Sequence, residues 1–321
     1  MRVSIAMTTF NGEKFLGNQL DSILNQSTKP DELIICDDSS SDKTLQILED
    51  FKNKAEFLVK IYRNEKNLGF RKNFEKAIGL CKEDLIFIAD QDDFWFPNKI
   101  ELMKKFISFK KECFVAINNT ELTDEKLIPS GITKLNQVKK FSGNSEGFIS
   151  GCCTVLKKEF LSLILPLSKN MEYDSWIHFV AINTNSRLVN NEILQYYRRH
   201  ESNTTMHLVS KLENINRKER YIKAFKRFFF TSQDKNRKIF NKMNYEESKI
   251  LKKRLINFTP SSLENSSEIS LKMEKFLDKK ITAYFLIEKL YKFRLLKKTL
   301  LSFFFLFKGK IRFKDLLFII F

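Results

Sequence analysis

Three carboxylates stand within four positions in the segment FIADQDDFWFP, at Asp90, Asp92 and Asp93. Like charges this close repel and raise one another's pKa, so these acids either face water or share a cation. Carboxylate oxygens are ligands that Mg²⁺ and Mn²⁺ prefer, and such an ion often binds a substrate diphosphate as well. Two acids spaced by one residue also occur in ordinary surface turns. Their position in the fold therefore has to decide between the two interpretations.

A second acidic pair, Asp37 and Asp38, lies in the segment ICDDSSSDKT. Capping of the next helix would explain Ser41 or Asp42 but not the pair itself, which could hydrogen-bond a base or a ribose. The glycine-rich turn of a dinucleotide-binding fold is missing after the first predicted strand, where TTFNGEKF stands instead. This absence counts against NAD or FAD as a cofactor.

Both acidic segments end strands of a repeated strand–helix pattern. In the first 110 residues, four apolar runs each precede a segment with helical hydrophobic spacing: VSIAMTT, DELIICDD, EFLVKIYR and DLIFIAD. This alternation predicts an α/β fold, a mostly parallel sheet with helices on both faces. Ligands of such sheets bind at the carboxyl ends of the strands. Four polar groups fall at these ends: Asn11, Asp37-Asp38, Asn67 and Asp90 to Asp93.

Beyond residue 110 the alternation loosens. The pattern predicts a strand at CFVAINN, a polar loop from Thr120 to Asn144, and a loop, strand and helix in EGFISGCCTVLKKEFLSLIL. MEYDSWIHFVAI has a helical pattern, and EILQYYRRHESNTT is typical of a strand that ends in charged groups. The five cysteines include no CxxC pair, so we interpret them as small buried residues in a reducing compartment.

The net charge of +17 is concentrated in the last part of the chain. Residues 201–321 hold 28 Lys and Arg against 12 Asp and Glu, which leaves 28 basic and 27 acidic groups in residues 1–200. Basic and aromatic residues interleave in this region with helical spacing. The pattern predicts either an amphipathic attachment to an anionic membrane surface or a helical subdomain with solvated lysines. No nucleic-acid motif accompanies the charge, so we expect no nucleic-acid partner.

These patterns divide the chain into a catalytic domain, 1–207, and a basic, aromatic-rich helical extension, 208–321. No signal-peptide pattern opens the sequence, and the longest apolar run near its end, LLSFFFLF, falls short of the roughly 20 residues of a spanning helix. We therefore expect a cytoplasmic protein that is peripheral on the cytoplasmic face of the inner membrane.

Four segments, in their order and spacing, resemble the family 2 glycosyltransferases of the GT-A fold: VSIAMTTFNGEKFLGNQLDSILNQ, ELIICDDSSSDKT, NEKNLGFRKNF and FIADQDDFWFPNKI. FISGCCTVLKKEF, YDSWI and LQYYRRHESN are similar to the rhamnosyltransferase-type branch that decorates bacterial surface polysaccharide. The resemblance covers residues 1–205. It implies a Rossmann-like GT-A domain and inverting transfer of a sugar, such as rhamnose, from a nucleotide-sugar to a saccharide or lipid-linked acceptor.

The resemblance also implies roles for single residues. Asp174 would be the general base that takes the proton of the acceptor hydroxyl, and Trp176 would form a wall for acceptor or sugar. Asp92, Asp90 and His200 would bind Mg²⁺ or Mn²⁺, with Asp93 in support. The nucleotide-sugar would be bound by the following set: Thr9, Asn11, Asp37, Asp38, Asn67, Arg71, Asp90, Gln91, Asp92, Arg198 and Arg199.

One departure and two alternatives accompany this prediction. The branch has His-Asp-Trp-Trp where this chain has Tyr173-Asp174-Ser175-Trp176, so we expect different acceptor contacts. A haloacid-dehalogenase-like phosphohydrolase also carries two acids after a strand. In that class, however, Thr or Val is expected where Phe94 stands, and the two acids follow the first strand, whereas here they follow the fourth. The other alternative is a non-catalytic, transferase-like partner of a polysaccharide assembly, and the retained Asp90, Asp92 and Asp174 count against it.

Overall fold

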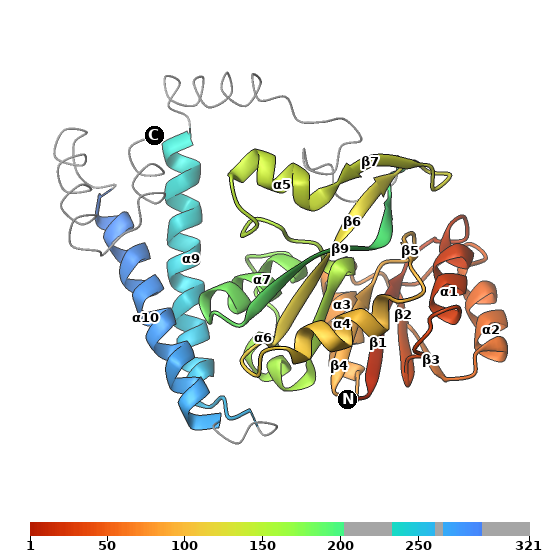
Figure 1. Cartoon of the computed structure of the whole chain (residues 1–321), viewed down its shortest axis with the longest axis horizontal. Helices are drawn as coiled ribbons and strands as arrows, with labels where there is room; N and C mark the ends of the chain where they lie inside the picture. Colours follow the sequence, from red (N-terminus) through yellow and green to blue (C-terminus); the bar gives the residue numbers. More distant parts are fainter. Residues whose placement is uncertain (202–232, 261–265, 291–321) are drawn as a thin grey trace. The chain divides into compact units, whose positions relative to one another are not determined.

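The computed structural model describes residues 1–201, 233–260 and 266–290 (Figure 1). The chain divides into two compact units, residues 1–182 with 186–215 and residues 183–185 with 216–321. The boundary predicted at residue 207 lies outside the described residues and stays a prediction.

A sheet of nine strands, counted over the described part of the chain, forms the first unit. Its first half is parallel and contains four neighbouring strands, in the order β3 (Leu58–Arg63), β2 (Glu32–Asp37), β1 (Val3–Thr9) and β4 (Leu85–Ala89). The second half is mixed, with the order β8 (Thr154–Lys157), β6 (Val115–Thr123), β9 (Arg187–Arg198) and β5 (Phe94–Trp95), while β7 (Pro129–Thr133) pairs with β6. Only β6 and β9 are parallel among these later pairs. The predicted α/β fold class is confirmed.

Helices cover both faces of the parallel half. All seven residues of β1 are buried, as expected for a strand packed on its two faces. Val3, Ile5 and Met7 pack in one core with α1 (Leu16–Leu24), α2 (Thr44–Lys54) and α4 (Lys99–Ser108), whereas α3 (Phe70–Leu80) contacts β1 and β2 outside that core. Successive side chains of a strand point to opposite faces, so β1 serves both layers.

The polar segment Thr120–Asn144 is not a loop, and this prediction was wrong. It contains the end of β6, the whole of β7 and the helix α5 (Lys134–Ser142). Its polar side chains find partners within the protein: Oγ1 of Thr120 donates to a carbonyl of the distant strand β9 at 2.9 Å, and Thr133 caps α5 by accepting from the amide of Asn136. Polar composition therefore misled, because these groups bond within regular structure instead of with water.

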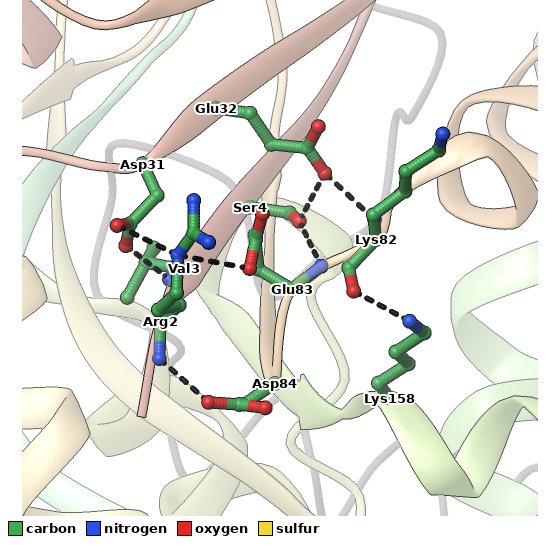
Figure 2. Close-up of polar contacts among 9 residues, drawn as sticks. All are labelled: Arg2, Val3, Ser4, Asp31, Glu32, Lys82, Glu83, Asp84 and Lys158. Carbon is green, nitrogen blue, oxygen red and sulfur yellow. Dashed lines mark hydrogen bonds and ion pairs between the residues drawn. The ribbon is translucent and has the colours of Figure 1, made fainter.

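Polar contacts tie the amino ends of the parallel strands together (Figure 2). The buried carboxylate of Glu32 accepts from Oγ of Ser4 at 2.7 Å and from the amide of Lys82 at 2.6 Å. The amide of Arg2 donates to Asp84 at 2.7 Å, directly before β4. This end of the sheet is thus fixed by its own side chains, and the opposite, carboxyl end carries the acidic segments.

The second unit contains two helices among its described residues, α9 (Gln233–Ile256) and α10 (Ser266–Leu290). They run antiparallel, since Asn241 Nδ2 donates to the carbonyl of Tyr284 at 3.0 Å and Lys252 pairs with Asp278 at 2.6 Å. The predicted helical extension is confirmed for these two segments, whereas ERYIKAFKRFFF lies outside the described residues. No helix in the described ranges combines the length and apolarity needed to cross a membrane.

Candidate active site

The acidic loop, residues 90–93, follows β4 and is held at both ends. The loop begins where the buried strand β4 stops. At its other end β5 pairs with β9, with Phe94 opposite Tyr196, and the ring of Phe96 meets that tyrosine edge-on with centroids 4.7 Å apart. The aromatic segment after the acids therefore fixes the direction in which the loop leaves the sheet.

Asp93 is the buried member of the loop, with 1% of its surface exposed. Its Oδ2 accepts from Nε2 of Gln195 at 2.9 Å, and its Oδ1 accepts from the amide of Arg198 at 3.3 Å. Burial raises its pKa well above the ordinary value, and the nearby Asp92 and Asp90 raise it further. Asp93 thus joins the loop to β9.

Asp90 shows that distant acids converge on one region. Burial raises its pKa to about 7, with further contributions from Asp92 and Asp174. Asp174 stands in the first turn of α7 (Tyr173–Asn183), where the amide of Ser175 donates to its Oδ1 at 2.6 Å. The two segments are separated by some 80 residues of sequence but lie near enough in the fold for the Asp174 charge to raise the pKa of Asp90.

Asp92 and His200 lie side by side. Nε2 of His200 is 2.8 Å from Oδ2 of Asp92, and the histidine ring packs on Phe15 with centroids 4.5 Å apart. An octahedral Mg²⁺ with bonds of about 2.1 Å places adjacent ligand atoms about 3 Å apart. The spacing and the oxygen and nitrogen donors of this pair therefore fit two ligands of one such ion.

A second group lies deeper. A carboxylate oxygen of Asp90, one of Asp93 and the thiol of Cys152 all lie within 4.8 Å of one another. Asp93 already accepts two hydrogen bonds from β9, and a thiol is a poor partner for a hard cation. The Asp92–His200 pair is therefore the better candidate for a Mg²⁺ or Mn²⁺ ligand set, with Asp90 beside it.

The residues after β1 and β2 form the neighbouring part of the same edge. Oδ2 of Asp37 accepts from Oγ1 of Thr9 at 2.9 Å and also from Ser40, and Asn11 at φ 44° accepts from the amide of Ser41 through its Oδ1. Asp37 is fully buried and Thr9 nearly so. These side chains hold the loop after β2 in place.

Asp38 performs the same task for the segment before α3. It accepts from Nδ2 of Asn64 and the amide of Leu68, both at 2.8 Å, and from the amide of Gly69 at 2.9 Å. Asn67 accepts from that glycine amide as well, at 2.9 Å. Gly69 has φ 82°, a conformation that favours glycine. This conformation belongs to the turn whose amides donate to Asp38.

The sequence matches the model of "Glycosyl transferase family 2" over residues 4–165, about half of the chain. The chain belongs to this family. It is 31% identical over 217 residues to the dTDP-rhamnosyl transferase RfbG of Shigella flexneri, with 61% of this chain and 72% of the relative covered. Family membership confirms the predicted resemblance and overturns the phosphohydrolase alternative.

A second relative supports the family assignment, and a solved structure supports the fold. The UDP-Glc:alpha-D-GlcNAc-diphosphoundecaprenol beta-1,3-glucosyltransferase WfgD of Escherichia coli is 28% identical over 218 residues, which cover 66% of this chain and 82% of the relative. The crystal structure of S. aureus TarS 1-349 in complex with UDP-GlcNAc aligns with a TM-score of 0.53 at 18% identity, over 89% of this chain and 72% of that one. The structural likeness shows the GT-A fold.

Two of the predicted ligand contacts in this glycosyltransferase need correction. Trp176 is fully buried and its Nε1 donates to the carbonyl of Ile164 at 2.8 Å, so it packs in the core and forms no wall for acceptor or sugar. Arg198, 3% exposed, donates through Nε to the carbonyl of Asp92 at 2.8 Å and stabilises the acidic loop instead of facing a ligand. The partners of Arg198 come from distant segments, so the sequence alone could not show that its guanidinium binds the protein instead of a diphosphate.

Gln91 also has protein partners. Its amide pairs with the backbone of Phe10, accepting from the nitrogen at 2.8 Å and donating to the oxygen at 3.1 Å. It therefore links the acidic loop to the end of β1. Two other predicted ligands also have protein partners: Nη1 of Arg71 donates to the carbonyl of Ser168 at 2.6 Å, and the guanidinium of Arg199 lies 6.0 Å from the Tyr197 ring centroid.

Sequence reasoning missed the residues that lie behind the acids: Lys99, Gln195, Cys152 and Tyr173. The Tyr173 ring stacks on Phe74 with centroids 4.0 Å apart and fixes the first turn of α7, where Asp174 stands. Only the departure from the branch pattern at Tyr173 gave a signal. Lys99 and Gln195 gave none, because a lysine on a helix and a glutamine on a strand usually face solvent.

Proposed function

We propose that this family 2 enzyme is an inverting glycosyltransferase of bacterial surface polysaccharide synthesis. It transfers a sugar, rhamnose being the first candidate, from a nucleoside diphosphate donor to a saccharide or lipid-linked acceptor. The names of the relatives support this proposal, since one is a dTDP-rhamnosyl transferase and another acts on a diphosphoundecaprenol-linked sugar. The convergence of Asp90, Asp92, His200 and Asp174 at one edge of the sheet is the observation that carries it.

Asp174 is the proposed general base. The oxygen of the acceptor hydroxyl attacks the anomeric carbon, the bond from that carbon to the diphosphate breaks, and the hydroxyl proton passes to the Asp174 carboxylate. Attack opposite to the leaving group inverts the anomeric configuration. The amide of Ser175 and the stacked Tyr173 ring hold this carboxylate at the start of α7, so the base is oriented before the substrate arrives.

Asp92 and His200 would hold a Mg²⁺ or Mn²⁺ ion, with Asp90 close by. When bound, this ion supplies positive charge that neutralises the departing diphosphate. The same charge would relieve the repulsion among the carboxylates, which adds to the effect of burial in raising the pKa of Asp90. Thr9, Asn11, Asp37, Asp38 and Asn67 would shape the nucleoside end of the pocket, because they fix the loops that border it.

Asp174→Asn tests the base. The amide keeps the size of the side chain but takes no proton, so we expect transfer to fall by about 10²-fold or more while donor binding stays within about twofold. Glu172→Gln is the matched control, since it removes the same charge from an exposed residue two positions away. Product formation by mass spectrometry and donor affinity by calorimetry are the measurements. Full transfer by Asp174→Asn would refute the mechanism.

The donor can be identified by ligand-induced stabilisation. We expect dTDP-rhamnose or UDP-glucose to raise the melting temperature in the presence of Mn²⁺ and less with EDTA, because a ligand that binds only the folded state stabilises it. Asp92→Asn should remove the metal-dependent part of the shift. A shift that does not depend on the ion in the wild-type enzyme would contradict the proposed cation site.

A further inference from the structure

A buried lysine lies between α4 and the acidic loop. Lys99 is 1% exposed, and its Nζ donates to the carbonyl of Cys152 at 2.9 Å and to Oε1 of Gln195. The same nitrogen lies 3.7 Å from the centroid of the Trp95 ring. Burying an ammonium group is costly unless it is paired and hydrogen-bonded, so these contacts define a specific position for Lys99.

Lys99 determines which way the amide of Gln195 faces. An ammonium group only donates hydrogen bonds, so the amide oxygen must face it. Nε2 of Gln195 is then directed to Oδ2 of Asp93, to which it donates at 2.9 Å. Gln195 has no exposed surface, and Oγ1 of Thr120 holds its backbone carbonyl at 2.9 Å. Without the lysine, the amide could turn and place its oxygen against the carboxylate.

Lys99 also donates a hydrogen bond to the short turn Gly151–Cys153. The Cys152 thiol in this turn lies within 4.8 Å of carboxylate oxygens of Asp90 and Asp93. The bond from Lys99 to the Cys152 carbonyl therefore fixes the turn against the acidic loop. One nitrogen thus links three segments that are distant in the sequence: the start of α4, the strand β9 and this turn.

We infer that Lys99 is a positioning residue for the cation site: through Gln195 and the Cys152 carbonyl it fixes the loop that presents Asp90 and Asp92. The inference rests on the proposed function, since it assigns Lys99 to a divalent cation bound with a nucleoside diphosphate. Lys99 itself contacts the protein through Nζ and acts on the ion only through the residues that it orients. Partners of metal ligands are known to matter in this way.

Lys99→Met tests the inference, because methionine keeps the length and the contact with Trp95 but cannot donate. Mn²⁺ is titrated into the full chain in the presence of UDP and, separately, of dTDP, and the free ion is followed by electron paramagnetic resonance. No sugar transfer is needed for this measurement. We expect the dissociation constant for Mn²⁺ to rise about tenfold or more in the variant.

Lys157→Met is the matched control. Lys157 also donates to a backbone carbonyl, that of Lys111 at 2.9 Å, and lies 5.1 Å from the Phe114 ring centroid. It pairs with Leu85 at the amino end of β4, away from the acidic loop. We expect this variant to bind Mn²⁺ as the wild type does, even if its melting temperature falls.

Gln195→Glu is a second variant in case Lys99→Met does not fold. The glutamate still accepts from Lys99 but cannot donate to Asp93 as a carboxylate, so Mn²⁺ should again bind about tenfold more weakly. The inference would be overturned if folded Lys99→Met or Gln195→Glu bound Mn²⁺ with wild-type affinity. It would also be overturned if Lys99→Met and Lys157→Met lost Mn²⁺ affinity equally. A wild-type enzyme that binds no Mn²⁺ with either nucleotide would instead overturn the cation site itself.

Discussion

At the scale of single residues, the three acids of the acidic loop differ in burial and in hydrogen-bond partners. Asp93 is buried and accepts two hydrogen bonds from β9, and Asp92 faces His200 at 2.8 Å. Asp90 is half-buried, with a carboxylate oxygen within 4.8 Å of one of Asp93. Three identical functional groups therefore experience three different environments. This explains why carboxylates that destabilise one another are kept at one place: the arrangement presents a preformed negative site for a cation.

Asp90→Asn should reveal the electrostatic cost of this site. The folded-state pKa of Asp90 is raised to about 7, so the folded protein binds the extra proton and stability falls as the pH rises from the ordinary carboxyl value toward 7. The amide removes this penalty. We expect Asp90→Asn to stabilise the protein more at pH 8 than at pH 5, by on the order of 1–2 kcal/mol after allowance for partial exposure.

Denaturant unfolding in EDTA at the two pH values measures this difference. Asp21→Asn, on the exposed side of α1, is the control for the loss of a surface carboxylate. An equal effect of Asp90→Asn at both pH values would contradict the raised pKa.

At the scale of elements, a contact between α7 and the turn Gly151–Cys153 positions Asp174, the proposed base. A Cβ atom added at Gly151 would overlap the hydroxyl of Tyr173 and lie 2.9 Å from a carbon of its ring. Tyr173 is buried and stacked on Phe74, so it has little room to move. The closeness of the two segments therefore requires glycine at this position.

Gly151→Ala should displace Tyr173 and with it Asp174. We expect a loss of stability of about 2–3 kcal/mol, as for other overpacked cores, together with a fall in kcat. Gly12→Ala is the comparison, because the atoms nearest to its added Cβ belong to the end of the half-buried Gln91 side chain, which can turn aside at the cost of its two hydrogen bonds to Phe10. Melting curves and transfer rates of the two variants test this ranking. A greater loss for Gly12→Ala would contradict it.

At the scale of the whole molecule, charge is divided unequally. Residues 1–200 are nearly neutral, with 28 basic and 27 acidic groups, whereas residues 201–321 carry 28 basic and 12 acidic groups. We propose that the second part attaches the enzyme to an anionic membrane surface, where a lipid-linked acceptor would be found. Each basic side chain near such a surface contributes about 1 kcal/mol.

Sedimentation with vesicles tests this attachment. We expect the full chain to bind vesicles that contain phosphatidylglycerol, to lose binding as salt is raised from 0.1 to 0.5 M, and to ignore pure phosphatidylcholine. The salt dependence follows from screening of the charges. Binding to neither kind of vesicle would favour the alternative, a helical subdomain with solvated lysines.

The sequence by itself determined the parallel half of the fold and the residues at its carboxyl edge. The strand–helix alternation and the ends of VSIAMTT, DELIICDD and DLIFIAD are local patterns, and each element forms where its own periodicity indicates. The polar stretch that became β7 and α5 escaped prediction, because its side chains are satisfied by partners that composition does not show.

The tertiary structure alone decided which of these residues are buried or already bonded to other parts of the protein. Trp176, Arg198 and Gln91 have the chemistry of ligand contacts, but packing places them in the core or in bonds to the backbone. Lys99 looks like a solvated helix residue in the sequence and is buried behind the acids. The physical reason is that burial and hydrogen-bond partners arise from long-range pairing, here of β9 with β5 and β6, which no local pattern records.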